Sequence, residues 1–233
     1  MKQFIDILNH GCWMHTSGTT GASKPVWQSK DRIAAANDAA RDLQGIDRHS
    51  RVLTVCDIEH AGGLLAQTLP AYEIGAHTDI LKFNPRTYMT DIRLYTHSHL
   101  TPRMARAIMK TRSFRDRPLT GKTITCGSEP VTSDIIEAFV GRGATFIANW
   151  GMTECGPVAI SSVYDSETEI VNDVSGLTVM GDQTFVDWTI EEGQLWVRGD
   201  ICSYTGWYPT GDRVEVIDGV MYYSGRTTDI QQP

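Results

Sequence analysis

Residues 123–148 read T-I-T-C-G-S-E-P-V-T-S-D-I-I-E-A-F-V-G-R-G-A-T-F-I-A, and the expected fold follows from this stretch. The two apolar runs at its ends, 123–126 and 145–148, are short and predict buried strands. Between them Ser133 begins a helical pattern and Gly141 ends it. The inward face of this helix is formed by Ile136, Phe139 and Val140. A strand, a helix and a second strand in succession predict one parallel pair of an α/β sheet.

The same alternation extends on both sides of this stretch and covers about residues 4–165. Residues 52–56 form another short apolar run, which predicts a further buried strand. Ser29 can cap a helix that Gly45 ends, and Thr101-Pro102 begins one more helix. The apolar faces of these two helices contain Ile33, Ala36, Ala40, Leu43, Met104 and Ile108. Strands that alternate with helices predict a mainly parallel α/β sandwich.

The pattern changes after about residue 171, where β-rich runs follow one another without helices. One hairpin is predicted at residues 189–198, and a stronger one at residues 214–223 around Asp218-Gly219. Asp-Gly between two β-rich runs is typical of a type I′ turn. We therefore expect a small, antiparallel, barrel-like subdomain after the α/β core. The predicted units are residues 1–168 and residues 169–233.

The composition is that of an ordinary globular protein. Of 233 residues 41% are hydrophobic, and Lys+Arg 21 against Asp+Glu 28 gives a net charge of −7. No basic patch is concentrated in the chain, so nucleic acid is not an expected partner. The cysteines are odd in number, widely spaced and without a C-x-x-C pair, which predicts reduced, mostly buried thiols and neither a disulfide framework nor a zinc site. They are Cys12, Cys56, Cys126, Cys155 and Cys202.

Neither a leader peptide nor a membrane span is expected. Residues 1–9 mix apolar side chains with Asp6 and have no small-residue cleavage site, unlike a signal peptide. No apolar run approaches the ~18 residues that a spanning helix requires. We therefore expect a cytoplasmic protein.

The most distinctive loop is formed by residues 16–26, T-S-G-T-T-G-A-S-K-P-V. Its glycines let the backbone approach a ligand closely, and its hydroxyl and backbone N–H groups can donate to phosphate oxygens. Lys24 adds a positive charge. A Walker A loop has glycine before the lysine and Ser or Thr after it, whereas Ser23 and Pro25 stand there. A phosphate loop of another class and a plain polar surface loop remain as interpretations.

This loop resembles the phosphate loop of the adenylate-forming superfamily, whose pattern is T-S-G-T-T-G-x-P-K. The superfamily includes acyl-CoA and aryl-CoA ligases, luciferases and the adenylation domains of peptide synthetases. Ser23 stands where the superfamily usually has proline, which should loosen the loop. The resemblance implies that the loop holds ATP phosphates through Thr16, Ser17, Gly18, Thr19, Thr20, Gly21 and Lys24.

Residues 149–154, N-W-G-M-T-E, are similar to the superfamily's Y-G-x-T-E segment. In the superfamily the aromatic ring lies against adenine, the threonine meets the phosphate and the glutamate helps to hold Mg²⁺. These roles fall on Trp150, Thr153 and Glu154, and Trp150 keeps the ring of the usual tyrosine without its phenol. Asn149, Gly151 and Met152 are implied as neighbours of the nucleotide. A buried aromatic residue in a turn at a strand end is the alternative.

Two later segments resemble the superfamily's ribose-binding motifs. Residues 208–212, Y-P-T-G-D, match its T-G-D motif, whose aspartate accepts hydrogen bonds from both ribose hydroxyls, a role that falls on Asp212. Residues 225–229, G-R-T-T-D, match its G-R-x-x-D segment, whose arginine contacts ribose or phosphate and corresponds to Arg226. An ordinary turn before a strand and a polar tail are the alternatives.

Two weaker segments resemble the parts of the superfamily that face adenine and the acid. Residues 126–130, C-G-S-E-P, are similar to the small-residue segment that lines both pockets, which implicates Gly127, Ser128, Glu129 and Pro130. Residues 58–64, I-E-H-A-G-G-L, resemble the H-x-x-G stretch, in which the histidine sits near the reacting carboxylate. His60 takes that place, and a histidine that merely begins a helix is the alternative.

The resemblance implies the ATP/AMP-binding core of an acyl- or aryl-CoA-synthetase-like ligase, which activates a small carboxylic acid with ATP. Lys24, His60, Thr153 and Glu154 are implied as catalytic, Glu154 as the Mg²⁺ ligand, and CoA as a candidate thiol. The superfamily has more chain before the loop and a C-terminal domain with a bridging lysine. We therefore expect a core truncated at both ends, weakly active alone, whose exposed faces a second copy or a partner chain covers. The alternatives are a non-catalytic nucleotide-binding module and one part of a split ligase.

Overall fold

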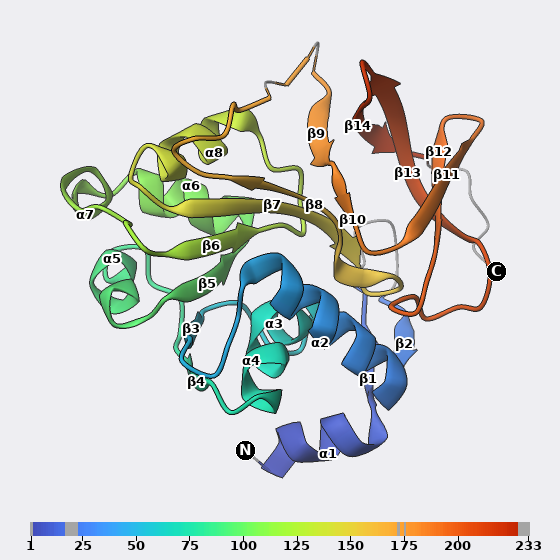
Figure 1. Ribbon diagram of the computed structural model, residues 1–233, viewed down its shortest axis with the longest axis horizontal. Helices are drawn as coiled ribbons and strands as arrows, with labels where there is room; N and C mark the ends of the chain where they lie inside the picture. The colour runs from blue at the N-terminus through green and yellow to red at the C-terminus, as the bar shows by residue number, and fades with distance from the viewer. Residues whose placement is uncertain (1, 17–22, 172, 175, 228–233) are drawn as a thin grey trace.

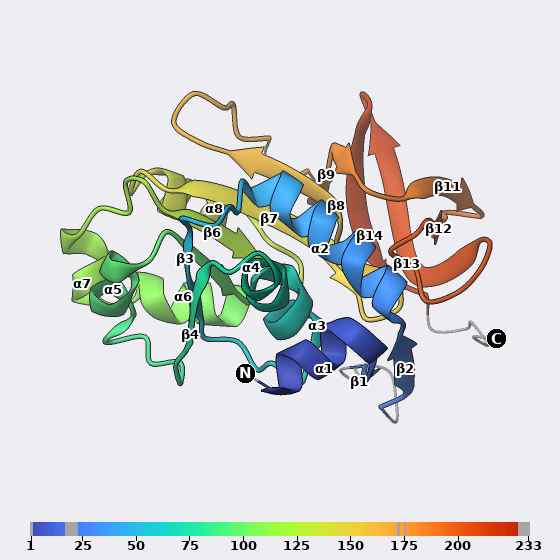
Figure 2. The same cartoon turned by 60° about the horizontal axis from the view of Figure 1, so that its bottom comes forward.

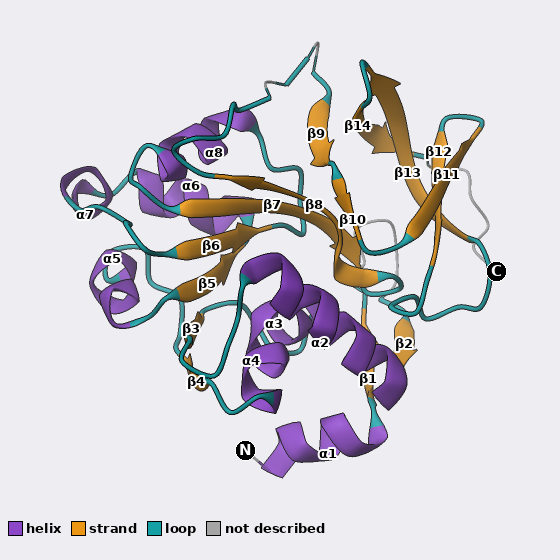
Figure 3. Ribbon diagram, viewed as in Figure 1, coloured by secondary structure: helices purple, strands orange, loops and turns teal. Residues whose placement is uncertain are grey.

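A seven-stranded mixed sheet forms the centre of the computed structural model, which describes residues 2–16, 23–171, 173, 174 and 176–227 (Figures 1 and 3). The strands lie in the order β10-β8-β7-β6-β5-β3-β4. Their bounds are β3 Arg51–Thr54, β4 His77–Ile80, β5 His97–Leu100, β6 Thr123–Cys126, β7 Thr145–Met152, β8 Gly156–Tyr164 and β10 Gln183–Thr184. Strands β4, β3, β5, β6 and β7 are parallel, and β8 and β10 are antiparallel to their neighbours. The predicted mainly parallel α/β sheet is confirmed.

Helices cover both faces of this sheet. Helices α2, α3 and α4 lie on one face, and α6 and α8 lie on the other (Figure 2). A π-helical turn, Leu64–Thr68, joins α3 to α4 into one helical segment that the sequence patterns did not predict. The helix bounds are α1 Lys2–His10, α2 Lys30–Gln44, α3 Ala61–Gly63, α4 Leu69–Glu73, α5 Tyr88–Asp91, α6 Pro102–Met109, α7 Arg112–Asp116 and α8 Ser133–Val140.

The predicted helix ends are set by the residues named from the sequence. The Ser29 hydroxyl accepts a hydrogen bond from the backbone N–H of Arg32 at 3.4 Å and caps α2. Gly45 ends that helix with φ 66°, the left-handed conformation that favours glycine. Thr101 caps α6 by accepting from the N–H of Met104 at 3.3 Å. Local chemistry therefore fixes where these helices begin and end.

Alternate residues of β7 face two different hydrophobic cores. Phe146 and Ala148 pack with the core under α6 and α8, whereas Ile147 packs with residues of α2. Phe139 of α8 is fully buried, and its ring centroid lies 5.3 Å from that of Phe146. The predicted strand at residues 52–56 is shorter than expected, because β3 ends at Thr54. The sheet is therefore buried on both faces, as a parallel sheet requires.

A separate antiparallel sheet of five strands follows, in the order β11-β12-β13-β14-β9. Both predicted hairpins are confirmed, and each turns on two residues with positive φ, Glu192-Gly193 and Asp218-Gly219. This sheet shares a hydrophobic core with β8, in which Leu195 and Val214 lie with Ile160. The bounds are β9 Thr178–Gly181, β11 Asp187–Glu191, β12 Gln194–Arg198, β13 Tyr208–Ile217 and β14 Val220–Arg226. The division of the chain at residues 168 and 169 stays a prediction.

A two-stranded ribbon near the N-terminus consists of β1 (Cys12–His15) and β2 (Pro25–Gln28). It was not predicted, and it places the two ends of the glycine-rich loop side by side. All five cysteines are free, and four are buried, as the composition predicted. Across the described ranges, no helix combines the length and the apolar character needed to traverse a bilayer.

Candidate functional site

The β1–β2 ribbon holds the neck of the glycine-rich loop. The backbone N–H of Thr16 donates to the Lys24 carbonyl at 3.0 Å, and the N–H of Lys24 donates to the Thr16 hydroxyl at 3.0 Å. The Ser23 hydroxyl donates to the Thr16 carbonyl at 2.7 Å. These bonds fix the Lys24 backbone at the base of the loop. The other predicted loop residues lie outside the described residues: Ser17, Gly18, Thr19, Thr20 and Gly21.

The N-W-G-M-T-E motif lies at the hairpin that joins β7 to β8. Strand β7 continues to Met152, so the motif begins inside a strand rather than after it, and residues 153–155 form the turn. A Cβ on Gly151 would lie 2.2 Å from the Gly156 carbonyl oxygen, which leaves room for glycine only. The pairing of β7 with β8 therefore explains why a glycine separates Trp150 from Met152.

Two buried carboxyl groups lie in this region, and each carries a charge that the other residues of the site influence. Glu154 is 5% exposed and Asp212, on β13, is 7% exposed. Burial raises the pKa of Glu154, and the negative charge of Asp212 raises it further. The positive charges of Arg226 and Lys24 act in the opposite direction and lower this pKa. Burial also raises the pKa of Asp212, against the charge of Arg226. We call Lys24, Glu154, Asp212 and Arg226 the charged cluster. The structure thus brings together residues that are far apart in the sequence.

Asp212 is held from two sides. The indole N–H of Trp150 donates to Oδ2 of Asp212 at 2.9 Å, and Nε of Arg226 lies 3.2 Å from Oδ1. Arg226 also donates from Nη2 to the Thr210 carbonyl at 3.0 Å. Each carboxylate oxygen has two acceptor positions, so both oxygens keep capacity for a further donor. Trp150 therefore supplies an N–H that orients the aspartate, in the place where the superfamily usually has a tyrosine.

Gln28 and Arg32 donate hydrogen bonds to the turn between β7 and β8, and the sequence patterns did not identify these two residues. The Gln28 amide donates to the Thr153 carbonyl at 2.9 Å. Arg32 Nη2 donates to the carbonyls of Ile201 at 2.5 Å and Glu154 at 3.4 Å, and burial lowers the pKa of Arg32 to about 10. Two polar residues one helical turn apart around the Ser29 cap are the signal that could have marked them.

Arg32 also reaches side chains with its other terminal nitrogen. Nη1 donates to the Ser203 hydroxyl at 2.6 Å and to the Gln28 side-chain carbonyl at 3.2 Å. The N–H of Ser203 in turn donates to the Glu154 carbonyl at 2.7 Å. Arg32 thus ties the start of α2 to the Glu154 turn and to the segment before β13.

The two segments assigned to the acid also come together. A Cβ on Gly127 would lie 2.5 Å from both the side-chain amide nitrogen and the backbone oxygen of Asn149, so the backbones of residues 127 and 149 nearly touch. A Cβ on Gly62 would lie 3.1 Å from the Ser128 hydroxyl oxygen. The 58–64 stretch therefore borders the residues that follow β6, next to the strand that carries Trp150.

His60 is exposed and takes the cap position of α3, where its side chain makes no capping hydrogen bond. His60 therefore does stand at the start of a helix, and its position leaves both interpretations of this histidine open. Ser128, Glu129 and Pro130 are exposed as well. The assignment of these residues to the acid and to adenine stays a prediction.

The site fits Mg²⁺ only together with phosphate oxygens. Within the part of the chain that the structure describes, no three or more His, Cys, Asp or Glu side chains gather at one point. Mg²⁺ is commonly bound by one or two carboxylates together with substrate phosphates. Buried Glu154, with two cations close by, offers such a carboxylate.

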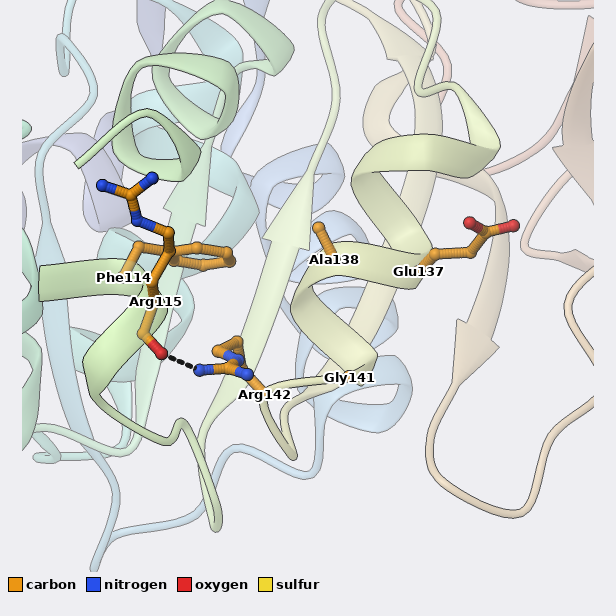
Figure 4. Close-up of a pocket in the computed structure, with 6 residues that line it drawn as sticks. All are labelled: Phe114, Arg115, Glu137, Ala138, Gly141 and Arg142. Carbon is orange, nitrogen blue, oxygen red and sulfur yellow. Dashed lines mark hydrogen bonds between the residues drawn. The ribbon is translucent and has the colours of Figure 1, made fainter. Parts of the chain in front are cut away.

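A hollow of about 330 Å³ lies apart from the charged cluster, at the ends of α7 and α8 (Figure 4). The guanidinium of Arg142 donates to the Arg115 carbonyl across it, whereas the Glu137 side chain points away (Figure 4). Its lining contains none of the predicted site residues. We assign it no role.

Comparisons with known proteins identify the family of the chain. The family model described as "AMP-binding enzyme" matches residues 11–208. An indoleacetate–CoA ligase of Aromatoleum aromaticum is 31% identical over 150 residues, which cover 62% of this chain and 29% of that protein. Atromentin synthetase invA1 of Paxillus involutus is 27% identical, over 91% of this chain and 27% of that protein. The chain thus spans less than a third of the length of these relatives.

Solved structures share the fold. ATP-bound MatB from Rhodopseudomonas palustris superposes with a TM-score of 0.77 at 19% identity, over 93% of this chain and 48% of that chain. Wild-type E. coli MenE with a bound analogue of OSB-AMS superposes with a TM-score of 0.71 at 17% identity, over 92% of this chain and 47% of that chain. At these identities the likeness concerns the fold.

Proposed function

The chain belongs to the AMP-binding enzyme family, and from this premise we propose that its charged cluster binds ATP with Mg²⁺ and activates a small carboxylic acid as the acyl adenylate. The observation that carries the proposal is the convergence of Lys24, Glu154, Asp212 and Arg226 around one turn. Two buried carboxyl groups and two exposed cations beside them match a ligand that has phosphates, a metal ion and a diol.

The ribose is proposed to bind at Asp212. Its side chain is 10% exposed, is aligned by Trp150 and Arg226, and keeps acceptor capacity on both carboxylate oxygens. A carboxylate that accepts from two adjacent hydroxyls suits a cis-diol. The Trp150 ring provides a π-face for adenine beside it.

The phosphates are proposed to lie between the glycine-rich loop and Glu154. Lys24 is anchored through its backbone at the neck of the loop, and its positive charge lowers the pKa of the Glu154 carboxyl group. When Mg²⁺ is bound it supplies positive charge at the phosphate oxygens, and Glu154 would hold it. Ionisation of Glu154, whose pKa burial raises, is therefore favoured by the metal.

In the proposed reaction a carboxylate oxygen of the acid attacks the α-phosphorus of ATP. The bond from that phosphorus to the oxygen bridging to the β-phosphorus breaks, and pyrophosphate leaves with the bond electrons. The chain's own residues align the reactants and offset charge: Asp212 and Arg226 hold the ribose, and Thr153 and Lys24 meet phosphates. A second step, in which a thiol such as CoA attacks the adenylate, is proposed for the whole protein.

Aromatic acids are the substrates we favour. The relatives include an indoleacetate–CoA ligase and a feruloyl-CoA synthase of Amycolatopsis, which is 28% identical over 62% of this chain. His60, exposed beside Gly62, is proposed to face the reacting carboxylate. Location in the cytoplasm and a covering second copy or partner chain stay predictions.

The test is ATP–pyrophosphate exchange over a panel of acids, with AMP binding measured in parallel by calorimetry. Glu154→Gln should lower Mg²⁺-dependent exchange about 10²–10³-fold, the effect of removing one charge-stabilising group, while AMP binding remains. Glu191→Gln, on the exposed face of β11, is the matched control and should leave exchange unchanged. AMP binding without any exchange would instead support the non-catalytic nucleotide-binding module.

A further inference from the structure

The side-chain amide of Gln28 connects the N-terminal ribbon to the turn between β7 and β8. Gln28 is the last residue of β2 and is 2% exposed. Its Nε2 donates to the Thr153 carbonyl at 2.9 Å, and its Oε1 accepts from Arg32 Nη1 at 3.2 Å. A guanidinium group can only donate, so the amide oxygen has to face Arg32 and the amide NH₂ has to face Thr153. The side chain therefore has one orientation, in which both of its polar atoms are bonded.

The backbone of Gln28 is held in place as well. Gln28 lies opposite Cys12 in the register of the ribbon. A Cβ on Gly11 would lie 2.3 Å from the Gln28 carbonyl oxygen, so the segment before β1 packs directly against this peptide group. Gly11 has φ 85°, which favours glycine, and this conformation permits the close approach. The position of the amide is therefore fixed by two neighbouring segments.

Strand β2 is a short link between two parts of the proposed site. Lys24, whose N–H donates to the Thr16 hydroxyl at the neck of the glycine-rich loop, directly precedes the strand, and Gln28 ends it. All four residues of β2 are paired with β1. The separation between Lys24 and the Thr153 carbonyl is therefore set by four residues of paired strand and one hydrogen bond.

Gln28 binds the first of two successive carbonyl groups in the turn. The second, that of Glu154, accepts from Arg32 Nη2 at 3.4 Å and from the N–H of Ser203 at 2.7 Å. Bonds to both carbonyls fix the orientation of two adjacent peptide groups. This orientation limits the directions in which the side chains of Thr153 and Glu154 can point.

We infer that Gln28 is a positioning residue, which places Glu154 relative to Lys24 so that one Mg²⁺ ion can bind Glu154 and the ATP phosphates together. This inference rests on the proposed function, in which Glu154 holds Mg²⁺ at the phosphate oxygens. Mg²⁺ requires near-octahedral geometry with ligands at about 2.0–2.1 Å, so a small displacement of its carboxylate weakens it. A hydrogen bond remote from the metal therefore controls how strongly Mg²⁺ tightens ATP binding.

The experiment measures ATP affinity by calorimetry on the whole chain, once with Mg²⁺ and once with EDTA. The ratio of the two affinities is the Mg²⁺ gain. We expect a gain of about 10-fold or more in the wild type, the contribution of a charge-assisted contact. A comparison of two affinities within one chain cancels losses that a variant suffers in both conditions.

Two variants remove the donor to Thr153 in different ways. Gln28→Met is neutral and similar in length, and it removes both polar atoms. Gln28→Glu keeps the acceptor for Arg32, but its carboxylate has no N–H for the Thr153 carbonyl. Each should lower the Mg²⁺ gain to about 2-fold or less, because a misplaced group loses most of its effect. Gln3→Glu, on the exposed face of α1, is the matched control and should keep the gain of the wild type.

Two further measurements separate positioning from stability. If Gln28 acts through Glu154, the double variant Gln28→Glu/Glu154→Gln should lower ATP–pyrophosphate exchange no further than Glu154→Gln alone, within about 2-fold. In the wild type saturated with ATP, addition of Mg²⁺ should shift the ¹⁵N resonance of the Gln28 side-chain amide. This resonance carries the test if neither variant at Gln28 folds.

A Mg²⁺ gain in both variants equal to that of the wild type would overturn the inference, because a purely structural role lowers both affinities alike. Losses of exchange that multiply in the double variant, or a Gln28 resonance that ignores Mg²⁺, would overturn it as well. If Mg²⁺ fails to tighten ATP binding by the wild type, the proposed function fails too, so the two failures are distinguishable.

Discussion

Replacement of Arg32 by methionine should loosen the turn that carries Glu154. Methionine keeps much of the length of arginine and removes its donors. The lost bonds include those from Nη2 to the carbonyls of Ile201 (2.5 Å) and Glu154 (3.4 Å) and from Nη1 to the Ser203 hydroxyl (2.6 Å). The Glu154 carbonyl keeps the N–H of Ser203 as a donor, so the turn is loosened rather than released.

The size of the effect follows from these contacts. Hydrogen bonds to a charged group contribute about 1.5–3 kcal/mol each, and bonds within one network are not additive. Arg32 is only partly buried, and water can replace part of what is lost. We therefore expect a loss of about 3 kcal/mol in the free energy of unfolding. For a chain of this length that corresponds to a fall in Tm of about 6–12 °C.

The assay is thermal unfolding followed by circular dichroism, together with calorimetric titration of ATP with Mg²⁺. Displacement of Glu154 should weaken Mg²⁺-dependent ATP binding about 10-fold, because a charge-assisted contact is lost. Lys30→Met, an exposed cation on the same helix, is the control and should change Tm by no more than about 2 °C. The reasoning would be refuted if the Arg32→Met chain had the same Tm as the Lys30→Met control and bound ATP as tightly as the wild type.

Three further predictions address the charged cluster and its surroundings. We expect the wild type to bind AMP about 10-fold or more tightly than 2′,3′-dideoxy-AMP. Asp212→Asn should abolish this preference, which calorimetry with both nucleotides measures. A preference that persists in the variant contradicts the ribose assignment. Glu154 has a raised pKa in the folded state, so the folded chain binds that proton more tightly and loses stability as the pH rises from the ordinary glutamate value, about 4.3, through the raised value. Glu154→Gln should therefore gain stability relative to the wild type across that window and gain none of it below, as denaturant melts at several pH values can show; a difference independent of pH would count against the burial of this carboxyl. Gly127→Ala should cost about 1–3 kcal/mol in denaturant melts, because its Cβ would lie 2.5 Å from the Asn149 backbone oxygen, and an unchanged midpoint would show that the two backbones can separate.

Much of the fold could be predicted because local chemistry determines it. Ser29, Gly45 and Thr101 set helix ends through caps that need only their own neighbours. The Asp218-Gly219 turn has positive φ at both residues, as its composition predicted. These features depend on residues adjacent in the sequence, so a single sequence suffices to find them.

Features that depend on distant contacts could not be predicted in this way. Nothing local indicates that Arg32 would reach Ile201 and Ser203 across more than 160 residues. The helical segment at residues 61–73 has a π-helical turn and a mostly buried surface, so no amphipathic period identifies it. The β1–β2 ribbon is formed by two short strands with exposed Trp13 and Trp27, which lack the pattern of a buried strand.

For the site, motifs indicated which residues matter but not how they are held. Asp212 and Arg226 were assigned to the nucleotide from short motifs, and the structure adds the bond from Trp150 that orients the carboxylate.

The central claim is that Glu154 and Asp212, two buried carboxyl groups, belong to one binding site for an adenosine nucleotide and Mg²⁺. The most direct measurement is a calorimetric titration of ATP with Mg²⁺ into the wild-type chain and into the double variant Glu154→Gln/Asp212→Asn. We predict saturable heat with one nucleotide per chain in the wild type and binding at least about 100-fold weaker in the double variant, because two charge-assisted contacts are lost together. No heat in the wild type, or equal affinity in both chains, would contradict the claim.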